Sequence, residues 1–280
     1  MKILILGCKG MLGHDLMVVF KKYHPIGWDI GNLDITKPKQ GFSKISKIKP
    51  DILINAAAYT DVDGAEKNKI VARKINSQAV GYLARTCLKL NATFVHFSTD
   101  YVFSGHKKGG YYEKDQPIKP INFYGLSKLG GEKEILKLKN RGLRYYLIRT
   151  AWLFGPKARP HQHKNFVDTI LRLAKIENEI KVVNDQWGCP TYSYDLAQAV
   201  KAMIEKKLSN GVYHITNSGA TTWYKFAKSI IRFSKNESKI SPCRTKEYRL
   251  PAKRPKYVIL LNTKLPPLRS WQRALKSYLS

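Results

Sequence analysis

The sequence predicts an α/β protein, with a doubly wound parallel sheet followed by a smaller C-terminal lobe. Two observations carry this prediction. Short apolar or β-branched runs alternate with helical patterns over the first half of the chain, and after Arg149 this alternation loosens into segments that contain loop-like stretches such as 251–255. Strands that alternate with helices form parallel sheets whose two faces are both covered by helices.

The elements of the first half are expected in strand–helix order. Besides a strand that ends near Asp29, we expect strands at residues 2–6, 52–56, 93–98 and 145–149. Helices are expected at residues 12–23, 63–90 and 122–138. In the longest of these helices, apolar side chains recur near helical spacing, as at Val71, Ile75, Leu83 and Leu88.

In the second half the strand–helix pattern loosens, and three helices stand out. Helices are expected at residues 166–175, 194–206 and 223–235. The last of them carries an apolar face that includes Phe226 and Ile230, and a basic face that includes Lys225 and Lys228. These segments predict a smaller second lobe.

A glycine-rich turn joins the first strand to the first helix. The run GCKGMLG at residues 7–13 has the spacing G-x-x-G-x-x-G. Glycines allow a tight turn and let a pyrophosphate approach the backbone, and the helix N-terminus presents free N–H groups to it. The strand–turn–helix context makes the motif specific. We therefore expect cofactor contacts from Gly7, Gly10, Met11, Leu12 and Gly13.

The predicted fold class is thus a Rossmann-like doubly wound parallel sheet with a smaller C-terminal substrate lobe. Residues 1–150 are expected to form the dinucleotide-binding domain, to which a segment near 192–217 returns. Residues 151–191 and 218–280 are expected to form the substrate-binding lobe. No apolar run approaches the roughly 18 residues that span a bilayer, so no membrane partner is expected.

The chain is strongly basic. It has 280 residues, with 50 Lys and Arg against 20 Asp and Glu, a formal net charge of +30. Such a field attracts nucleotides, phosphates, nucleic acid or acidic proteins, although a solvated lysine-rich surface explains it as well. The four cysteines lack CxxC spacing, so neither a disulfide framework nor a zinc site is expected and a reducing cytoplasm fits.

Tyr124 and Lys128 lie four residues apart in a predicted helix and therefore share one face. A nearby ammonium lowers the pKa of a phenol, which can then exchange a proton near neutral pH. Thr99 lies 25 residues upstream, at the end of a predicted strand, where open α/β sheets bind ligands. This set predicts catalysis by Thr99, Tyr124 and Lys128 on a carbonyl or alcohol.

Cofactor choice depends on the end of the second strand. Asp29 is the candidate there, because a carboxylate accepts hydrogen bonds from the adenosine ribose and repels a 2′-phosphate. The next residue is Ile30 rather than an arginine, so the sequence leans mildly to NADH. Lys9 and Lys22 could still favour NADPH, and Asp29 could be a plain turn residue.

Five runs, together with the glycine turn, resemble one family. The runs are NAAAYTDVD at 55–63, STDYVF at 98–103, YGLSK at 124–128, RTAWLFG at 149–155 and NDQWGCPT at 184–191. In this order they resemble the dTDP-4-dehydrorhamnose reductase family of extended short-chain dehydrogenases/reductases. The resemblance extends from Met1 to about Leu261. It implies reduction of the C4 keto group of dTDP-4-dehydro-L-rhamnose to dTDP-L-rhamnose with NADH or NADPH, in deoxysugar biosynthesis.

The resemblance also implies roles for individual residues. Thr99 would polarise the sugar carbonyl, Tyr124 would protonate the alkoxide, and Lys128 would assist Tyr124 and hold the cofactor ribose. Further cofactor contacts would come from Asp34, Ile35, Ala56, Ala57 and Ala58. Substrate contacts would come from Thr60, Val62, Thr99, Phe103, Trp152, Asn165, Gln186, Thr191 and Arg254.

Some residues depart from the family pattern. Cys8 stands in the glycine turn where a smaller residue is common, and Trp187 and Cys189 alter the run that ends in Pro190-Thr191. His161 and His163 flank Gln162 in a polar loop that is expected to be solvated. No acidic cluster suggests a metal, so none is predicted.

Other functions stay open from the sequence. The chain could be a non-catalytic regulatory subunit, like the β subunit of methionine adenosyltransferase, which resembles the same family. It could be another nucleotide-sugar enzyme, such as an epimerase or a dehydratase. Besides the nucleotide-sugar substrate, a homodimer partner and a nucleic acid or acidic partner for the basic residues of 225–276 are open alternatives.

Overall fold

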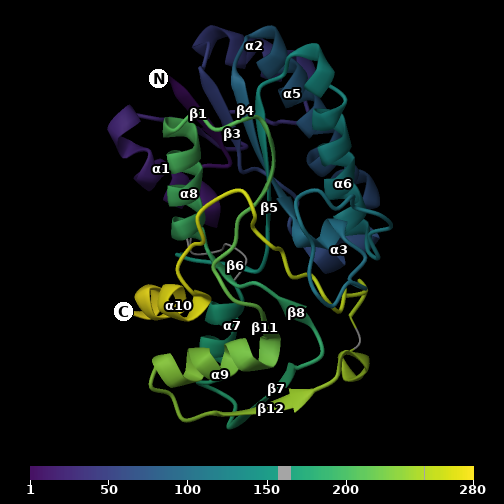
Figure 1. The fold of residues 1–280 in the computed structure, drawn as a ribbon, viewed down its shortest axis with the longest axis vertical. Helices are drawn as coiled ribbons and strands as arrows, with labels where there is room; N and C mark the ends of the chain where they lie inside the picture. The colour runs from purple at the N-terminus through teal and green to yellow at the C-terminus, as the bar shows by residue number, and fades with distance from the viewer. Residues whose placement is uncertain (157–164, 249) are drawn as a thin grey trace.

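The computed structural model describes residues 1–156, 165–248 and 250–280. Its centre is a parallel sheet in the order β10-β5-β4-β3-β1-β2 (Figure 1). The strands are β1 (Ile3–Leu6), β2 (Ile26–Trp28), β3 (Ile52–Asn55), β4 (Thr93–Thr99), β5 (Tyr145–Thr150) and β10 (Gly211–His214). The strand order reverses between β1 and β3, and parallel sheets bind ligands at the carboxyl ends of the strands beside such a point. The predicted α/β class and Rossmann-like sheet are confirmed.

Helices cover both faces of the sheet. One face carries α1 (Met11–Val19) and α8 (Ser193–Glu205), and the other carries α2 (Pro38–Ile48), α5 (Ala79–Lys89) and α6 (Phe123–Leu136) (Figure 1). Strand β1 shows the reason. Ile3 and Ile5 point into the core beneath α1 and α8, whereas Leu4 and Leu6 point to the opposite core. Alternate side chains of a strand face opposite sides, so a strand that is apolar throughout needs both covers.

The prediction of one continuous helix at residues 63–90 is wrong. The structure has α3 (Val62–Lys67), α4 (Lys69–Arg73), a π-helical turn η2 (Lys74–Gln78) and then α5. Asn68 leaves helical geometry at φ −107° and donates to the Gly64 carbonyl, as short polar side chains do when they compete with the helical ladder. The buried Asn76 side chain bonds the Tyr59 backbone and Ser127, which accounts for the π-turn around it.

Two other helical predictions differ from the structure. The helix predicted at 12–23 ends at Val19 and is followed by the short 3-10 turn η1 (Lys21–Tyr23). The helix α2 was not predicted. Its sequence PKQGFSKISKI combines three apolar side chains with a proline, a glycine and several lysines and serines, and only Gly41 and Ile45 are buried. The other 3-10 turns of the first half are η3 (Asp100–Val102) and η4 (Lys139–Arg141).

The second lobe has its own core beneath the sheet domain (Figure 1). Its helices are α7 (Phe166–Leu173), α9 (Trp223–Phe233) and α10 (Trp271–Leu279), and a short 3-10 turn is η5 (Thr245–Glu247). The strands outside the central sheet form three pairs: β6 (Leu153–Phe154) with β9 (Thr191–Tyr192), β7 (Glu179–Val183) with β12 (Lys239–Cys243), and β8 (Trp187–Gly188) with β11 (Thr221–Thr222).

The chain returns from this lobe to the sheet. Helix α8 packs against α1, and β10 pairs in parallel with β5 at the sheet edge. The domain boundaries at residues 150, 191 and 217 stay a prediction. Within the described residues, none of the helices is long and apolar enough to cross a membrane.

Candidate active site

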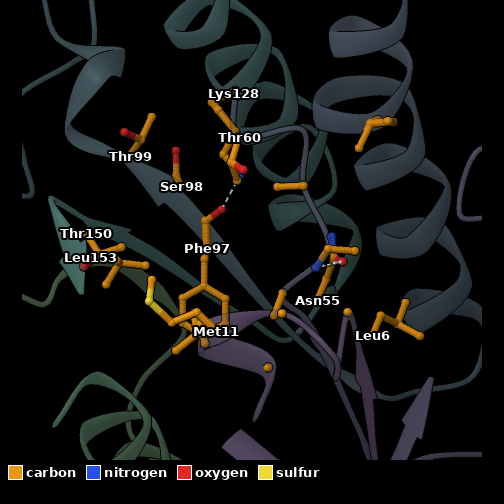
Figure 2. A pocket seen from close by; sticks show the side chains of 18 of the residues that line it. Leu6, Met11, Asn55, Thr60, Phe97, Ser98, Thr99, Lys128, Thr150 and Leu153 are labelled. Atoms are coloured by element: carbon orange, nitrogen blue, oxygen red, sulfur yellow. Dashed lines mark hydrogen bonds between the residues drawn. The ribbon is translucent and has the colours of Figure 1, made fainter. Parts of the chain in front are cut away.

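One cavity of about 820 Å³ opens at the carboxyl ends of β1, β3, β4 and β5 (Figure 2). Its walls come from the glycine turn, the strand ends, the first turns of α6, and side chains from later segments of the chain that include Trp152, Asn165, Trp223 and Arg254. All the residues predicted to bind the cofactor line it. They are Gly7, Gly10, Met11, Leu12, Gly13, Asp29, Asp34, Ile35, Ala56, Ala57, Ala58, Tyr124 and Lys128.

The glycine turn fits a dinucleotide because side chains would obstruct it. Gly7 has φ +77°, and a Cβ there would lie 2.7 Å from the Ala57 nitrogen. A Cβ on Gly13 would overlap the Gly7 carbonyl oxygen. The first turn of α1 has no side-chain cap on its N–H groups and no acidic residue. The turn therefore offers backbone donors and a positive helix end to an anion such as a pyrophosphate.

Asp29 lies at the end of β2 and is joined to the glycine turn. Its Oδ2 accepts a hydrogen bond from the Lys9 N–H at 3.1 Å, and its Oδ1 accepts one from the Ile30 N–H at 2.9 Å. Asp34 follows on the same rim, where hydrogen bonds from Thr36 hold the pKa of its carboxyl below the ordinary value. Two carboxylates therefore line the side of the cavity where the adenosine is expected.

The predicted catalytic residues lie together on the other side of the glycine turn. Thr99 ends β4, and Tyr124 and Lys128 occupy the first turns of α6, which begins after Asn122. The Asn122 side chain caps the helix by accepting the Gly125 N–H at 2.8 Å. The cap fixes where α6 begins, and with it the height of Tyr124 above the sheet edge.

Lys128 is almost completely buried, and its ammonium donates to the Phe97 carbonyl at 2.6 Å (Figure 2). Burial lowers its pKa to about 8, while the charge of Glu132 acts in the opposite direction. Burial raises the pKa of Tyr124, and the charge of Asp100 raises it further, whereas a hydrogen bond with Thr99 lowers it. The expectation that Lys128 lowers the pKa of this phenol is wrong here. Tyr124 keeps its proton, which suits a proton donor.

A buried ion pair lies next to the catalytic residues and was not predicted. Arg149 of β5 donates to Glu132 of α6 through Nε at 3.0 Å and Nη2 at 2.8 Å, and both side chains are at most 3% exposed. Ser98 donates to the same carboxylate at 2.5 Å. These bonds fix α6 against the ends of β4 and β5. The sequence held one sign of this ion pair, because a charged residue such as Arg149 in an apolar strand needs a buried partner of opposite charge.

The substrate side of the cavity is built from side chains. The Arg254 guanidinium donates to the Asp63 carboxylate at 2.6 Å and to the Ala252 carbonyl, and it faces the cavity with 13% of its side chain exposed. Trp152 has φ +46° and its ring stacks on Trp223 at 3.5 Å between centroids. Trp223 was not predicted, because an aromatic residue at the start of an amphipathic helix reads as core.

Nine residues were predicted to contact the substrate, and the structure brings six of them to the cavity: Thr60, Val62, Thr99, Trp152, Asn165 and Arg254. Asn165 caps α7 by accepting the Asp168 N–H, and its amide donates to the Gly155 carbonyl.

The other three predicted substrate contacts do not line the cavity, because they are packed elsewhere, and their contact with the substrate stays a prediction. Phe103 is buried, with its ring stacked on Tyr111 at 4.1 Å. Thr191 is fully buried and donates to the Cys189 carbonyl. Gln186 is buried and donates to the Thr245 hydroxyl at 3.0 Å.

The departures from the family pattern are accommodated by packing. The Cys8 side chain lies beside Gly27, where the missing Cβ leaves room for it. Cys189 packs in a buried cluster with Phe103, and Trp187 stands beneath the Lys225 ammonium.

Metal binding finds no support in the described residues. In ranges 1–156, 165–248 and 250–280, no three or more His, Cys, Asp or Glu side chains are grouped to hold a metal ion. His161, Gln162 and His163 lie outside the described residues.

Comparisons with known proteins agree over the whole length. A family model described as the RmlD substrate binding domain matches residues 1–280. This chain is 38% identical to a curated dTDP-4-dehydrorhamnose reductase from Aggregatibacter actinomycetemcomitans, covering 99% of this chain and 97% of that protein.

Two solved structures are similar over almost every residue. One is a dTDP-4-dehydrorhamnose reductase from Clostridium acetobutylicum, with TM-score 0.93 and 39% identity, covering 100% of this chain and 98% of that one. The other is a dTDP-4-dehydrorhamnose reductase from Bacillus anthracis in complex with NADP, with TM-score 0.92 and 36% identity, covering 99% of both chains.

Proposed function

Because this chain belongs to the dTDP-4-dehydrorhamnose reductase family, we propose that it reduces the C4 ketone of dTDP-4-dehydro-L-rhamnose to the alcohol of dTDP-L-rhamnose. The observation that carries the proposal is the convergence of Thr99, Tyr124 and Lys128 with the glycine turn in one cavity. A ketone reductase needs these two parts together, a cradle for the dinucleotide and a proton donor beside the carbonyl.

The chemistry divides between cofactor and protein. A nicotinamide cofactor, when bound, supplies the hydride. Tyr124 supplies the proton for the oxygen that gains negative charge, and it holds that proton through the neutral range because its pKa is raised. Lys128 lies one helical turn away in the same cavity, where its ammonium is placed to hold the cofactor ribose.

One basic side chain on the substrate side of the cavity, Arg254, supports a diphosphate substrate. Arg254 reaches the cavity from the C-terminal segment, and guanidinium groups bind phosphate oxygens with two parallel hydrogen bonds. Trp152 and Trp223 supply an apolar wall for the deoxysugar ring. We therefore assign the nucleotide diphosphate to the Arg254 side and the hexose to the space between the indoles and Thr99.

The cofactor is NADH or NADPH. The complex of the Bacillus anthracis relative holds NADP, whereas Asp29 with Ile30 beside it supports a mild preference of this chain for NADH. The ratio of kcat/KM for the two cofactors measures this preference directly. For the compartment we propose the cytoplasm, which fits the buried thiols of Cys87, Cys189 and Cys243.

The decisive experiment is turnover by the purified full chain. With dTDP-4-dehydro-L-rhamnose and either cofactor, the absorbance of the reduced nicotinamide should fall and the product should gain two hydrogens by mass. Y124F should lower kcat by about a hundredfold to ten-thousandfold, the range of general acid catalysis, and leave cofactor affinity unchanged. Absence of turnover with both cofactors would refute the proposal, and so would a product that has lost water.

A further inference from the structure

Asp100 is a buried carboxyl group beside Thr99 in the cavity, and it takes no part in the hydride or proton transfer. It follows Thr99 at the start of η3, lines the cavity, and is 2% exposed. It forms no ion pair with a described residue. One carboxyl oxygen, Oδ1, accepts the Thr99 hydroxyl at 2.8 Å. The other, Oδ2, is buried and has no hydrogen-bond partner among the residues that the structure describes.

The direction of that hydrogen bond conflicts with the role of Thr99. A threonine hydroxyl has one proton to donate and two lone pairs that accept. Its proton is directed to Asp100, while its oxygen accepts the Tyr101 N–H at 3.2 Å. As long as Asp100 is a carboxylate, it can only accept, so the hydroxyl has no proton left for a sugar carbonyl.

Protonation of Asp100 resolves this conflict. A carboxylic acid can donate to the Thr99 oxygen, whose two lone pairs are then filled by Asp100 and the Tyr101 N–H. The hydroxyl proton is then released toward Tyr124, the other hydrogen-bond partner of Thr99, or toward the substrate carbonyl. A buried carboxyl group that forms no ion pair favours this neutral form.

We propose that Asp100 is a positioning residue that must be protonated for the Thr99 hydroxyl to donate to the substrate carbonyl. The inference rests on the proposed function and deepens it. Asp100 loses no proton in the reaction. Tyr124 supplies the proton that the oxygen gains, the cofactor supplies the hydride, and the Asp100 proton only sets the direction of the hydrogen bonds.

The surroundings place this protonation in the working pH range. Burial raises the pKa of Asp100 to about 7, although hydrogen bonds from Thr99 and nearby backbone N–H groups oppose the rise. The groups that face it are two phenols, Tyr101 of η3 and Tyr124 of α6, and the thiol of Cys189.

Burial raises the pKa of the Tyr101 and Tyr124 phenols and of the Cys189 thiol, so all three stay neutral where Asp100 titrates. The nearby cations are committed elsewhere. Lys128 donates to the Phe97 carbonyl, and Arg254 pairs with Asp63.

A pH profile tests the proposal in the full-length enzyme. The active form has Asp100 protonated, so kcat should fall as pH rises through about 7. Between pH 6 and 7.5 a single group with this pKa predicts a fall of about fourfold. Lys128, with a pKa of about 8, would change kcat by only about 1.3-fold over the same interval.

D100N carries an amide that donates to Thr99 but cannot ionise. Its kcat should change by less than about 1.5-fold over this interval, because only the Lys128 titration is left. T99V removes the hydroxyl through which Asp100 acts, so T99V and the double variant T99V/D100N should have the same pH profile. A fourfold fall retained in D100N would overturn the proposal, as would a difference between these two T99V profiles.

Two further measurements keep the test decisive. Fluorescence titration with NADPH checks that each variant still folds and binds the cofactor. Infrared difference spectra between the wild type and D100N report the carboxyl group without turnover. A carboxylic acid band that disappears near pH 7 is expected, and a band already lost below pH 5 would overturn the proposal. Because this readout needs no substrate, it separates a failure of the inference from a failure of the proposed reaction.

Discussion

The two sides of the cavity are built in different ways. The cofactor side is a turn of backbone, where Gly7 and Gly13 leave no space for a Cβ and the donors are main-chain N–H groups. The substrate side consists of side chains, such as Arg254 and Trp223, brought from segments far apart in the sequence. Backbone sites depend on short local motifs, whereas side-chain sites depend on the packing of the whole chain. Substitutions in the glycine turn should therefore weaken cofactor binding strongly. Substitutions on the substrate side should have smaller effects, limited to the KM for the nucleotide sugar.

The largest effect is expected from G13A. The new Cβ would overlap the Gly7 carbonyl oxygen, so the turn must deform or open. We expect the Kd for NADH or NADPH to rise by about a hundredfold, which corresponds to about 2.7 kcal/mol.

The measurement is a fluorescence titration, with the Tm as a check on folding. G109A is the matched control, because no atom lies within 4 Å of a Cβ built there. If G13A bound the cofactor as tightly as G109A, the shape of the backbone in the glycine turn would not determine cofactor binding.

A smaller and more selective effect is expected from W223A. The variant removes the ring that stacks on Trp152, while the glycine turn is untouched. We expect KM for the nucleotide sugar to rise about tenfold, or about 1.4 kcal/mol, with cofactor Kd unchanged.

Trp223 also contacts Phe166 and Phe226, so the change costs stability as well. W223F keeps an aromatic ring and should recover most of the lost affinity. Equal rises in substrate KM and cofactor Kd would show that the two sides are not separable.

The sequence predicted the cofactor side better for a physical reason. The glycine turn is a local structure, so one short run was enough to assign Gly7, Gly10, Met11, Leu12 and Gly13, and all of them line the cavity. The break in the predicted helix 63–90 was not visible, because Asn76 is held by Ser127, which lies 51 residues away. On the substrate side, Phe103, Gln186 and Thr191 belong to family runs but are used in packing. A motif identifies residues that a family shares, and it does not separate those that bind ligands from those that pack.

Asp100 and Trp223 illustrate the same limit from the opposite direction. Asp100 belongs to the family run STDYVF at 98–103, but its burial and its hydrogen bond with Thr99 are visible only in three dimensions. Trp223 belongs to none of the five family runs, and it reaches the cavity because α9 begins there.

The smallest effect is expected from D63N, which tests how the substrate side is assembled. Asp63 of α3 accepts the Arg254 guanidinium at 2.6 Å and the Ala252 N–H at 3.0 Å, so it fixes the C-terminal segment against the sheet domain. The amide keeps the shape but loses the charge. Arg254 should become less well placed for a diphosphate, and KM for the nucleotide sugar should rise about threefold, with kcat within about twofold, as for a partly exposed ion pair.

The same kinetics on D115N provide the control, because Asp115 pairs with Lys107 at 2.5 Å on the surface, away from the cavity. R254A in the D63N background sharpens the result. If Asp63 acts only by holding Arg254, the double variant should have the KM of R254A alone, because the carboxylate then has no guanidinium to position. Additive effects would mean that Asp63 influences the substrate by another route, and the C-terminal segment would then not be the element that carries the diphosphate contact.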